Sequence, residues 1–132
     1  MKLEVVCGIL NCQVITGHDK LGEEVKVGCG ADLMSDVLAF IKPNALLLTG
    51  LTNVQSVRTA EIAEVIAIVY VRGKLPDKDA IELAKEKGIV LLCTNLPMYE
   101  SCGRLYQHGL HGGSELQEGL RDAKRATLLA TL

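Results

Sequence analysis

The sequence is poor in aromatic residues and has no surplus of basic charge. It holds no Trp, 1 Phe and 3 Tyr in 132 residues, so neither a base-stacking platform nor an aromatic cage for a cation is expected. Its 14 Lys and Arg stand against 16 Asp and Glu, for a net charge of −2. The chain therefore lacks the excess of positive charge that binds a phosphate backbone, and we expect no nucleic acid among its partners.

Long apolar runs and a secretory signal are also missing. The sequence has no run of about 18 apolar residues, the length that a membrane-spanning helix needs. The first residues, Met1–Val6, include Glu4 and lack the apolar core of a signal peptide. We therefore predict a cytoplasmic protein that does not bind a membrane. In that compartment the 5 cysteines, which form no CxxC pair, are expected to be reduced and packed as small apolar residues.

The common cofactor and nucleophile motifs are absent as well. The chain has no GxxxxGK[ST] string, no GxGxxG string and no GxSxG string, which argues against a P-loop, a dinucleotide fingerprint and a hydrolase elbow. His108 and His111 follow Cys102, but Gly109 lies between them, and a metal site usually needs a tighter set of four ligands. We predict no cofactor, no metal and no catalytic residue.

What the sequence does contain is a regular alternation of apolar runs and helical patterns. The continuous apolar runs 45–49, 65–71 and 89–94 predict strands buried on both faces, as in a parallel sheet. Capped helical patterns lie between and after these runs, at 53–64, 77–87 and 97–108. Strand–helix alternation of this kind predicts an α/β fold with helices packed on the sheet.

The first 44 residues are less regular. Residues 3–11 fit a short helix or a strand, residues 13–16 read as a strand, and the alternating 24–27 segment predicts a more exposed edge strand. Asp32 is expected to cap a helix over 32–41 whose core stripe is Leu33, Val37 and Phe40. The whole pattern predicts a three-layer domain: a mostly parallel sheet of about five strands with helices on both faces.

The composition shifts near residue 110. We predict one domain over 1–110, and over 111–132 a linker and C-terminal tail. Within the tail, Ser114 and Gln117 form a capping-box pattern that favours a final helix.

The most suggestive feature is the set of residues just after each predicted strand. In open parallel sheets, ligands gather beyond the carboxyl ends of the strands. There the sequence offers glycines, hydroxyl and amide groups, two cations and helix N-termini suited to an anion. The candidate residues for a small anionic ligand such as a nucleotide are Gly30, Asp32, Thr49, Gly50, Thr52, Asn53, Arg72, Gly73, Lys74 and Thr94. The competing interpretation is that they are ordinary caps and turns.

Two other functions stay open on the residues alone. Cys29 lies between glycines before a predicted helix, whose dipole can activate a thiol. Asp32 and Asp36 are one helical turn apart, a spacing that suits acid–base work. Either feature would make the protein an enzyme. The remaining alternative is a protein-interaction module whose partner packs on exposed helices or on the tail.

The same segments resemble the DRTGG-domain family. The resemblance covers residues 3–110 and depends on an ordered set of segments rather than on one motif. The matching segments are Ala31–Ala39, Leu46–Asn53, Val71–Lys74 with Pro76-Asp77, and Met98–Tyr106. The literal Asp-Arg-Thr-Gly-Gly string is missing, and Val71–Lys74 stands in its place.

The resemblance implies the fold of the N-terminal domain of HPr kinase/phosphorylase. It also implies a non-catalytic regulatory module, found alone or between CBS domains in nucleotide-regulated pyrophosphatases. The chain is not itself an HPr kinase, because the phosphate-binding loop is missing. Such domains pair as dimers, and the apolar fraction of 48% points the same way. We expect a homodimer whose contact includes Met34, Leu38 and Ile41 of the 32–41 helix.

Overall fold

A five-stranded sheet forms the centre of the molecule. The computed structural model describes residues 1–113 and 118–132, so the capping box predicted at Ser114 and Gln117 lies outside the described residues. The strand order is β1-β5-β4-β3-β2, with β2 to β5 parallel and β1 antiparallel to β5. The strands are β1 Gln13–Thr16, β2 Val27–Gly30, β3 Ala45–Thr49, β4 Ala67–Tyr70 and β5 Val90–Cys93. The predicted mostly parallel sheet is confirmed.

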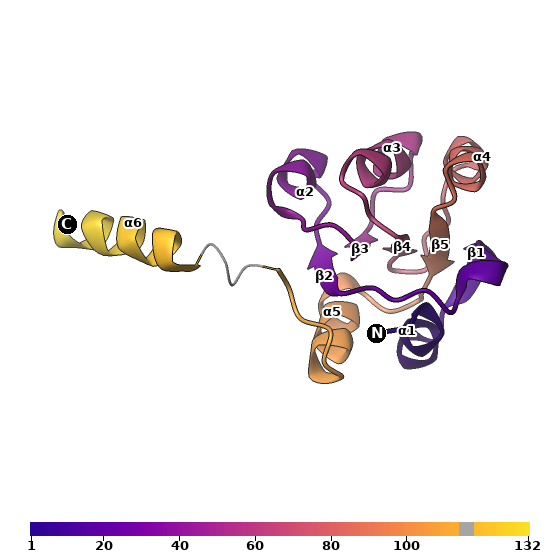
Figure 1. The fold of residues 1–132 in the computed structure, drawn as a ribbon, viewed down its shortest axis with the longest axis horizontal. Helices are drawn as coiled ribbons and strands as arrows, with labels where there is room; N and C mark the ends of the chain where they lie inside the picture. The colour runs from indigo at the N-terminus through magenta and orange to yellow at the C-terminus, as the bar shows by residue number, and fades with distance from the viewer. Residues whose placement is uncertain (114–117) are drawn as a thin grey trace.

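Helices cover both faces of this sheet. Figure 1 shows α2, α3 and α4 side by side on one face and α1 and α5 on the other. Because each strand from β2 to β5 pairs with the next in sequence, the connecting helices α2 to α4 fall on one face. The helices are α1 Leu3–Leu10, α2 Met34–Phe40, α3 Val54–Ile62, α4 Lys78–Lys87, α5 Met98–Gln107 and α6 Glu118–Ala130, with a 3-10 turn at His18–Lys20. The three-layer α/β class is confirmed.

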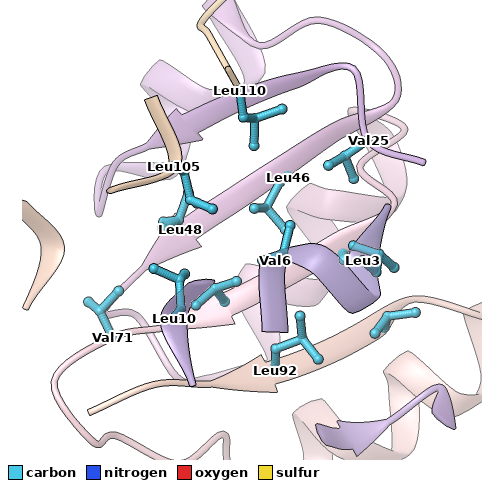
Figure 2. Packing of buried hydrophobic residues seen from close by; sticks show 13 residues of the cluster. Leu3, Val6, Leu10, Val25, Leu46, Leu48, Val71, Leu92, Leu105 and Leu110 are labelled. Carbon is cyan, nitrogen blue, oxygen red and sulfur yellow. The ribbon is translucent and has the colours of Figure 1, made fainter. Parts of the chain in front are cut away.

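The first residues form a helix because their apolar side chains recur at helical spacing. Leu3, Val6 and Leu10 are buried on one side of α1. They face alternate residues of the sheet, among them Leu46 and Leu92, as Figure 2 shows. This contact decides between the helix and the strand that the sequence left open over residues 3–11.

The opposite face of the sheet is also apolar but contains buried hydroxyl groups. Leu47 faces this side, whereas its neighbours Leu46 and Leu48 face α1 and α5. The Tyr70 hydroxyl lies 2.8 Å from the Ser56 hydroxyl, and both residues are fully buried. A shared hydrogen bond allows these polar groups to enter the core without an unpaired atom.

The edge strand begins three residues later than the alternating 24–27 pattern predicts. Val27 to Gly30 pair with Ala45 to Leu48, whereas the Val25 N–H donates to the Met1 carbonyl at 2.8 Å. The segment before Val27 therefore joins the N-terminus, and the glycines expected after the strand lie within it. The outer edge of β2 is partly covered, because the Gly28 N–H donates to the His111 carbonyl at 2.9 Å.

The predicted core stripe of α2 is correct at Val37 and wrong at Leu33 and Phe40. Met34 and Val37 are buried and Ile41 packs beside them, whereas Leu33 and Phe40 are 62% and 54% exposed. The cause is the start of the helix: Leu33 occupies the N-cap position, and Asp32 bonds the end of β3 instead of capping. A helix that begins at Met34 turns its 34, 37, 41 stripe toward the sheet.

Candidate functional site

Asp32 ties the start of the β2–α2 connection to the end of β3. Its Oδ1 accepts hydrogen bonds from the Gly50 N–H at 2.7 Å and from the Thr49 hydroxyl at 3.1 Å. The Thr49 hydroxyl oxygen in turn accepts a bond from the Leu51 N–H at 3.1 Å. Thr49 is fully buried, so the carboxylate satisfies a hydroxyl that water cannot reach. The predicted capping role of Asp32 is wrong.

A cation completes this group on the other side of Gly50. The Lys74 ammonium donates to the Gly50 carbonyl at 3.2 Å. A Cβ on Gly50 would lie 3.5 Å from both Asp32 Oδ1 and Lys74 Nζ, so the two charged groups flank the glycine. We call Asp32, Thr49, Gly50 and Lys74 the Asp32 cluster; four of the predicted site residues meet here.

Arg72 and Gly73 form a tight turn at the end of β4. Their φ angles are 62° and 68°, and the Lys74 N–H donates to the Val71 carbonyl at 3.3 Å. An arginine in this left-handed region is uncommon and costs of order 1 kcal/mol. The neighbouring chain holds the turn, because the Arg72 N–H donates to the Leu96 carbonyl and the Gly73 N–H to the Thr94 carbonyl.

The side chains of Arg72 and Lys74 are both exposed. Neither forms an ion pair with any acidic residue among those that the structure describes, where Lys87 and Glu61 make the one salt bridge, at 3.3 Å. Asp77 and Asp79, the acidic residues that follow in the sequence, form no ion pair with either cation. Two cations at the carboxyl edge of the sheet remain available to an anion.

Two of the predicted site residues, Thr52 and Asn53, lie just before α3 and hold the backbone there. Asn53 caps the helix, accepting a bond from the Gln55 N–H at 3.1 Å. The Thr52 carbonyl accepts a bond from the Asp77 N–H at 2.9 Å. Both roles are structural, and they fix the backbone between the end of β3 and the start of α4.

The Thr94 side chain and Gly30 face other parts of the fold, although the Thr94 carbonyl accepts the bond from the Gly73 N–H. The Thr94 side chain is buried, and its hydroxyl donates to the Leu10 carbonyl at 2.7 Å. Gly30 makes room for α5, because a Cβ there would lie 2.7 Å from Cys102 Sγ. These contacts use Thr94 to hold α1 and Gly30 to pack the other face of the sheet.

A second polar site lies where β5 ends and β1 begins. A cleft of about 290 Å³ is lined by Asn11, Gln13, Gly73, Leu75, Cys93 and Asn95; we call it the amide cleft. Gln13 pairs with Cys93, so the antiparallel edge strand brings its first residues to the carboxyl end of β5. The sequence-based candidates include Thr94 at this strand end but not its neighbour Asn95, nor Asn11 or Gln13. Knowledge of the β1–β5 pairing would have revealed the last two.

The catalytic alternatives receive no support from this geometry. Cys29 lies within β2 rather than in a turn, and burial raises the pKa of its thiol above the ordinary value. A protonated thiol is a poor nucleophile. The Asp32 carboxylate is engaged by Gly50 and Thr49, and Asp36 is exposed on α2.

No group of three or more His, Cys, Asp and Glu side chains that could hold a metal ion occurs in the described ranges. Across the same residues, no helix is both long enough and apolar enough to cross a bilayer.

The sequence matches no protein-family model and no curated protein. Among solved structures, the chain is similar to the CBS and DRTGG domains of the regulatory region of Clostridium perfringens pyrophosphatase, complexed with its activator, diadenosine tetraphosphate. The TM-score is 0.65 at 17% identity, and the match covers 80% of this chain. The fold is DRTGG-like. This agrees with the fold expected from the sequence, which is confirmed. The chain spans 46% of the length of that structure.

Proposed function

We propose that this chain is a non-catalytic, cytoplasmic regulatory domain that dimerises and binds a small anionic ligand, namely a nucleotide, at the carboxyl edge of its sheet. The observation that carries this proposal is the pair of exposed cations on one strand end. Arg72 and Lys74 stand on a turn that the backbone of residues 94–96 holds in place. The solved neighbour is a regulatory region complexed with a dinucleotide activator.

The charges at this edge favour a phosphate. Charge-assisted hydrogen bonds from Arg and Lys to phosphate are worth about 1.5–3 kcal/mol each. The Lys74 ammonium already lies at the Gly50 carbonyl, and the start of α3 follows within a few residues. A phosphate beside Gly50 would therefore meet Lys74 and the positive end of that helix. Arg72 lies two residues before Lys74 on the same turn. The Asp32 carboxylate holds the Gly50 N–H and would repel a phosphate, so we place the phosphate on the side of Gly50 where Lys74 lies.

Dimerisation would cover the apolar side chains that α2 exposes. Leu33 at the N-cap and Leu38 and Phe40 within α2 are 62%, 47% and 54% exposed. A partner packed on this helix would remove their apolar surface from water. These three replace Met34 and Ile41 as the contact residues, because Met34 and Ile41 pack inward. Sedimentation equilibrium is expected to give twice the mass of 14.2 kDa; a monomer at high micromolar concentration would contradict the dimer.

Calorimetric titration with diadenosine tetraphosphate and with ATP tests the ligand proposal. Arg72→Ala is expected to weaken binding by about 10-fold or more, as the loss of one charge-assisted bond implies. The matched control is Arg104→Ala, which removes the same charge from exposed α5 on the other face of the sheet. Equal affinity in the wild type and in Arg72→Ala would exclude an anion site at this turn.

A further inference from the structure

The amide cleft is lined by groups that carry no charge. Three side-chain amides, those of Asn11, Gln13 and Asn95, surround it. The buried Cys93 thiol also lines the cleft, and burial raises its pKa to about 11, so this thiol is neutral at physiological pH. Leu75, 62% exposed, adds an apolar side chain to the lining. The lining offers hydrogen-bond donors and acceptors without a charged partner, which suits a neutral polar group.

The three amides are not used by the fold. Their side chains make no hydrogen bond with any part of the protein that the structure describes. Each amide offers two N–H donors and one carbonyl acceptor. Three such groups around one cleft can match a ligand that presents donors and acceptors on adjacent atoms.

The backbone keeps the cleft open. Gly73 is in the left-handed region at φ +68°, and a Cβ there would lie 3.2 Å from Asn95 Oδ1. Asn11 is also left-handed, at φ 51°, where it ends α1. Asparagine and glycine are the residues that adopt this conformation most readily. The cleft therefore owes its shape to two positions where a bulkier residue would be strained.

The cleft adjoins the proposed phosphate site through one residue. Gly73 lines the cleft, and its two neighbours are Arg72 and Lys74. Lys74 reaches away from the cleft to the Gly50 carbonyl at 3.2 Å. A ligand with a neutral ring at one end and phosphates at the other could therefore place its ring among the amides and its phosphates beyond Gly73, near Arg72 and Lys74.

We propose that the amide cleft binds the adenine base of a nucleotide whose phosphates lie against Arg72 and Lys74; this rests on the proposed function. Adenine presents its N6 amino group beside the N7 acceptor, a pattern that an Asn or Gln amide can bind with two hydrogen bonds. The cleft volume of about 290 Å³ is just below the roughly 300–1,000 Å³ common for small-molecule sites. It suits one base and leaves the phosphates outside.

Titration of ATP and of inorganic tripolyphosphate into the same protein separates base binding from phosphate binding. The wild type is expected to bind ATP about 10-fold or more tightly than tripolyphosphate, the value of one good amide–base pair. In Asn95→Ala this preference is expected to fall to about 2-fold or less, with tripolyphosphate affinity unchanged. The matched control Gln107→Ala removes an exposed amide from α5 and is expected to keep the wild-type preference.

Each other outcome has a defined meaning. Equal affinity for ATP and tripolyphosphate in the wild type would overturn the base site and leave the proposed phosphate site standing. Absence of binding by either ligand would overturn both. Should Asn95→Ala fail to fold, Gln13→Ala on the edge strand replaces it. In the wild type, adenosine should shift the side-chain NH₂ signals of Asn11, Gln13 and Asn95; unshifted signals would also overturn the proposal.

Discussion

The Asp32 cluster and the amide cleft both lie at the carboxyl edge of the sheet, but they use their polar groups differently. In the Asp32 cluster, the carboxylate accepts two hydrogen bonds and the Lys74 ammonium donates to Gly50. In the amide cleft, none of the three amides bonds a described residue. The first group holds the end of β3 in place, whereas the second leaves its hydrogen-bonding capacity to solvent or to a ligand.

This difference separates residues that stabilise the fold from residues that can bind. A polar group that the fold satisfies costs stability when it is removed. An exposed group without a protein partner changes stability little. Substitution of Asp32 should therefore affect unfolding, and substitution of the three amides should affect ligand affinity. Lys74 serves both, because its ammonium donates to the Gly50 carbonyl and is also a proposed phosphate ligand.

The largest expected loss of stability follows Asp32→Ala. The substitution removes two bonds to a charged acceptor and leaves the buried Thr49 hydroxyl without its acceptor. We expect the free energy of unfolding in urea to fall by about 2–3 kcal/mol. Asp32→Asn keeps one acceptor oxygen and should lose about half as much. A loss below about 0.5 kcal/mol for Asp32→Ala would mean that the cluster does not hold β3.

A smaller effect is expected from the Cys93 thiol of the amide cleft at high pH. Burial raises its pKa from 9.0 to about 11, so between these values the folded state keeps a proton that the unfolded state has lost. The thiol's contribution to stability is therefore complete below pH 9 and declines as pH rises toward 11. Between pH 7 and pH 9.5 the free energy of unfolding of the wild type is expected to fall by roughly 1 kcal/mol more than that of Cys93→Ala. Parallel pH curves for the two proteins would contradict this.

The smallest effect is expected for Asn95→Ala measured on the fold alone. Its side chain is exposed and bonds no described residue, so the free energy of unfolding should stay within about 0.5 kcal/mol of the wild type. Urea titration of the unliganded protein provides the check. A loss above about 1.5 kcal/mol would place Asn95 with Asp32 as a structural residue and would weaken the comparison.

The sequence predicted the regular part of the fold well, because burial on both faces leaves a continuous apolar run. The run at 45–49 is β3 without change, and α3 and α4 lie within the predicted helical patterns 53–64 and 77–87. Asn53 and Gly88 are their caps, at the N-terminus of α3 and the C-terminus of α4. It failed at the edge of the sheet. Residues 24–27 alternate like a strand, yet the paired residues are 27–30, where two glycines carry no pattern.

The site was predictable in part for the same reason. Strand ends in a parallel sheet meet at one edge, so Thr49, Gly50 and Lys74 could be grouped from their positions. The bond between Asp32 and Gly50 could not be predicted. A short acidic side chain at position 32 is equally able to cap the next helix or to bond the end of a neighbouring strand. Asn11 and Gln13 reach the edge only through the antiparallel pairing of β1 with β5, which no local pattern encodes.

Mapping a bound nucleotide by backbone amide chemical shifts tests most directly the claim that this edge binds a ligand. With ¹⁵N-labelled protein and ATP, the largest shifts are expected at Gly50, at Arg72–Lys74 and at Asn95, with small shifts along α5. Shifts that gather on α5 or on the exposed side of α2, or a spectrum that ATP leaves unchanged, would contradict the account.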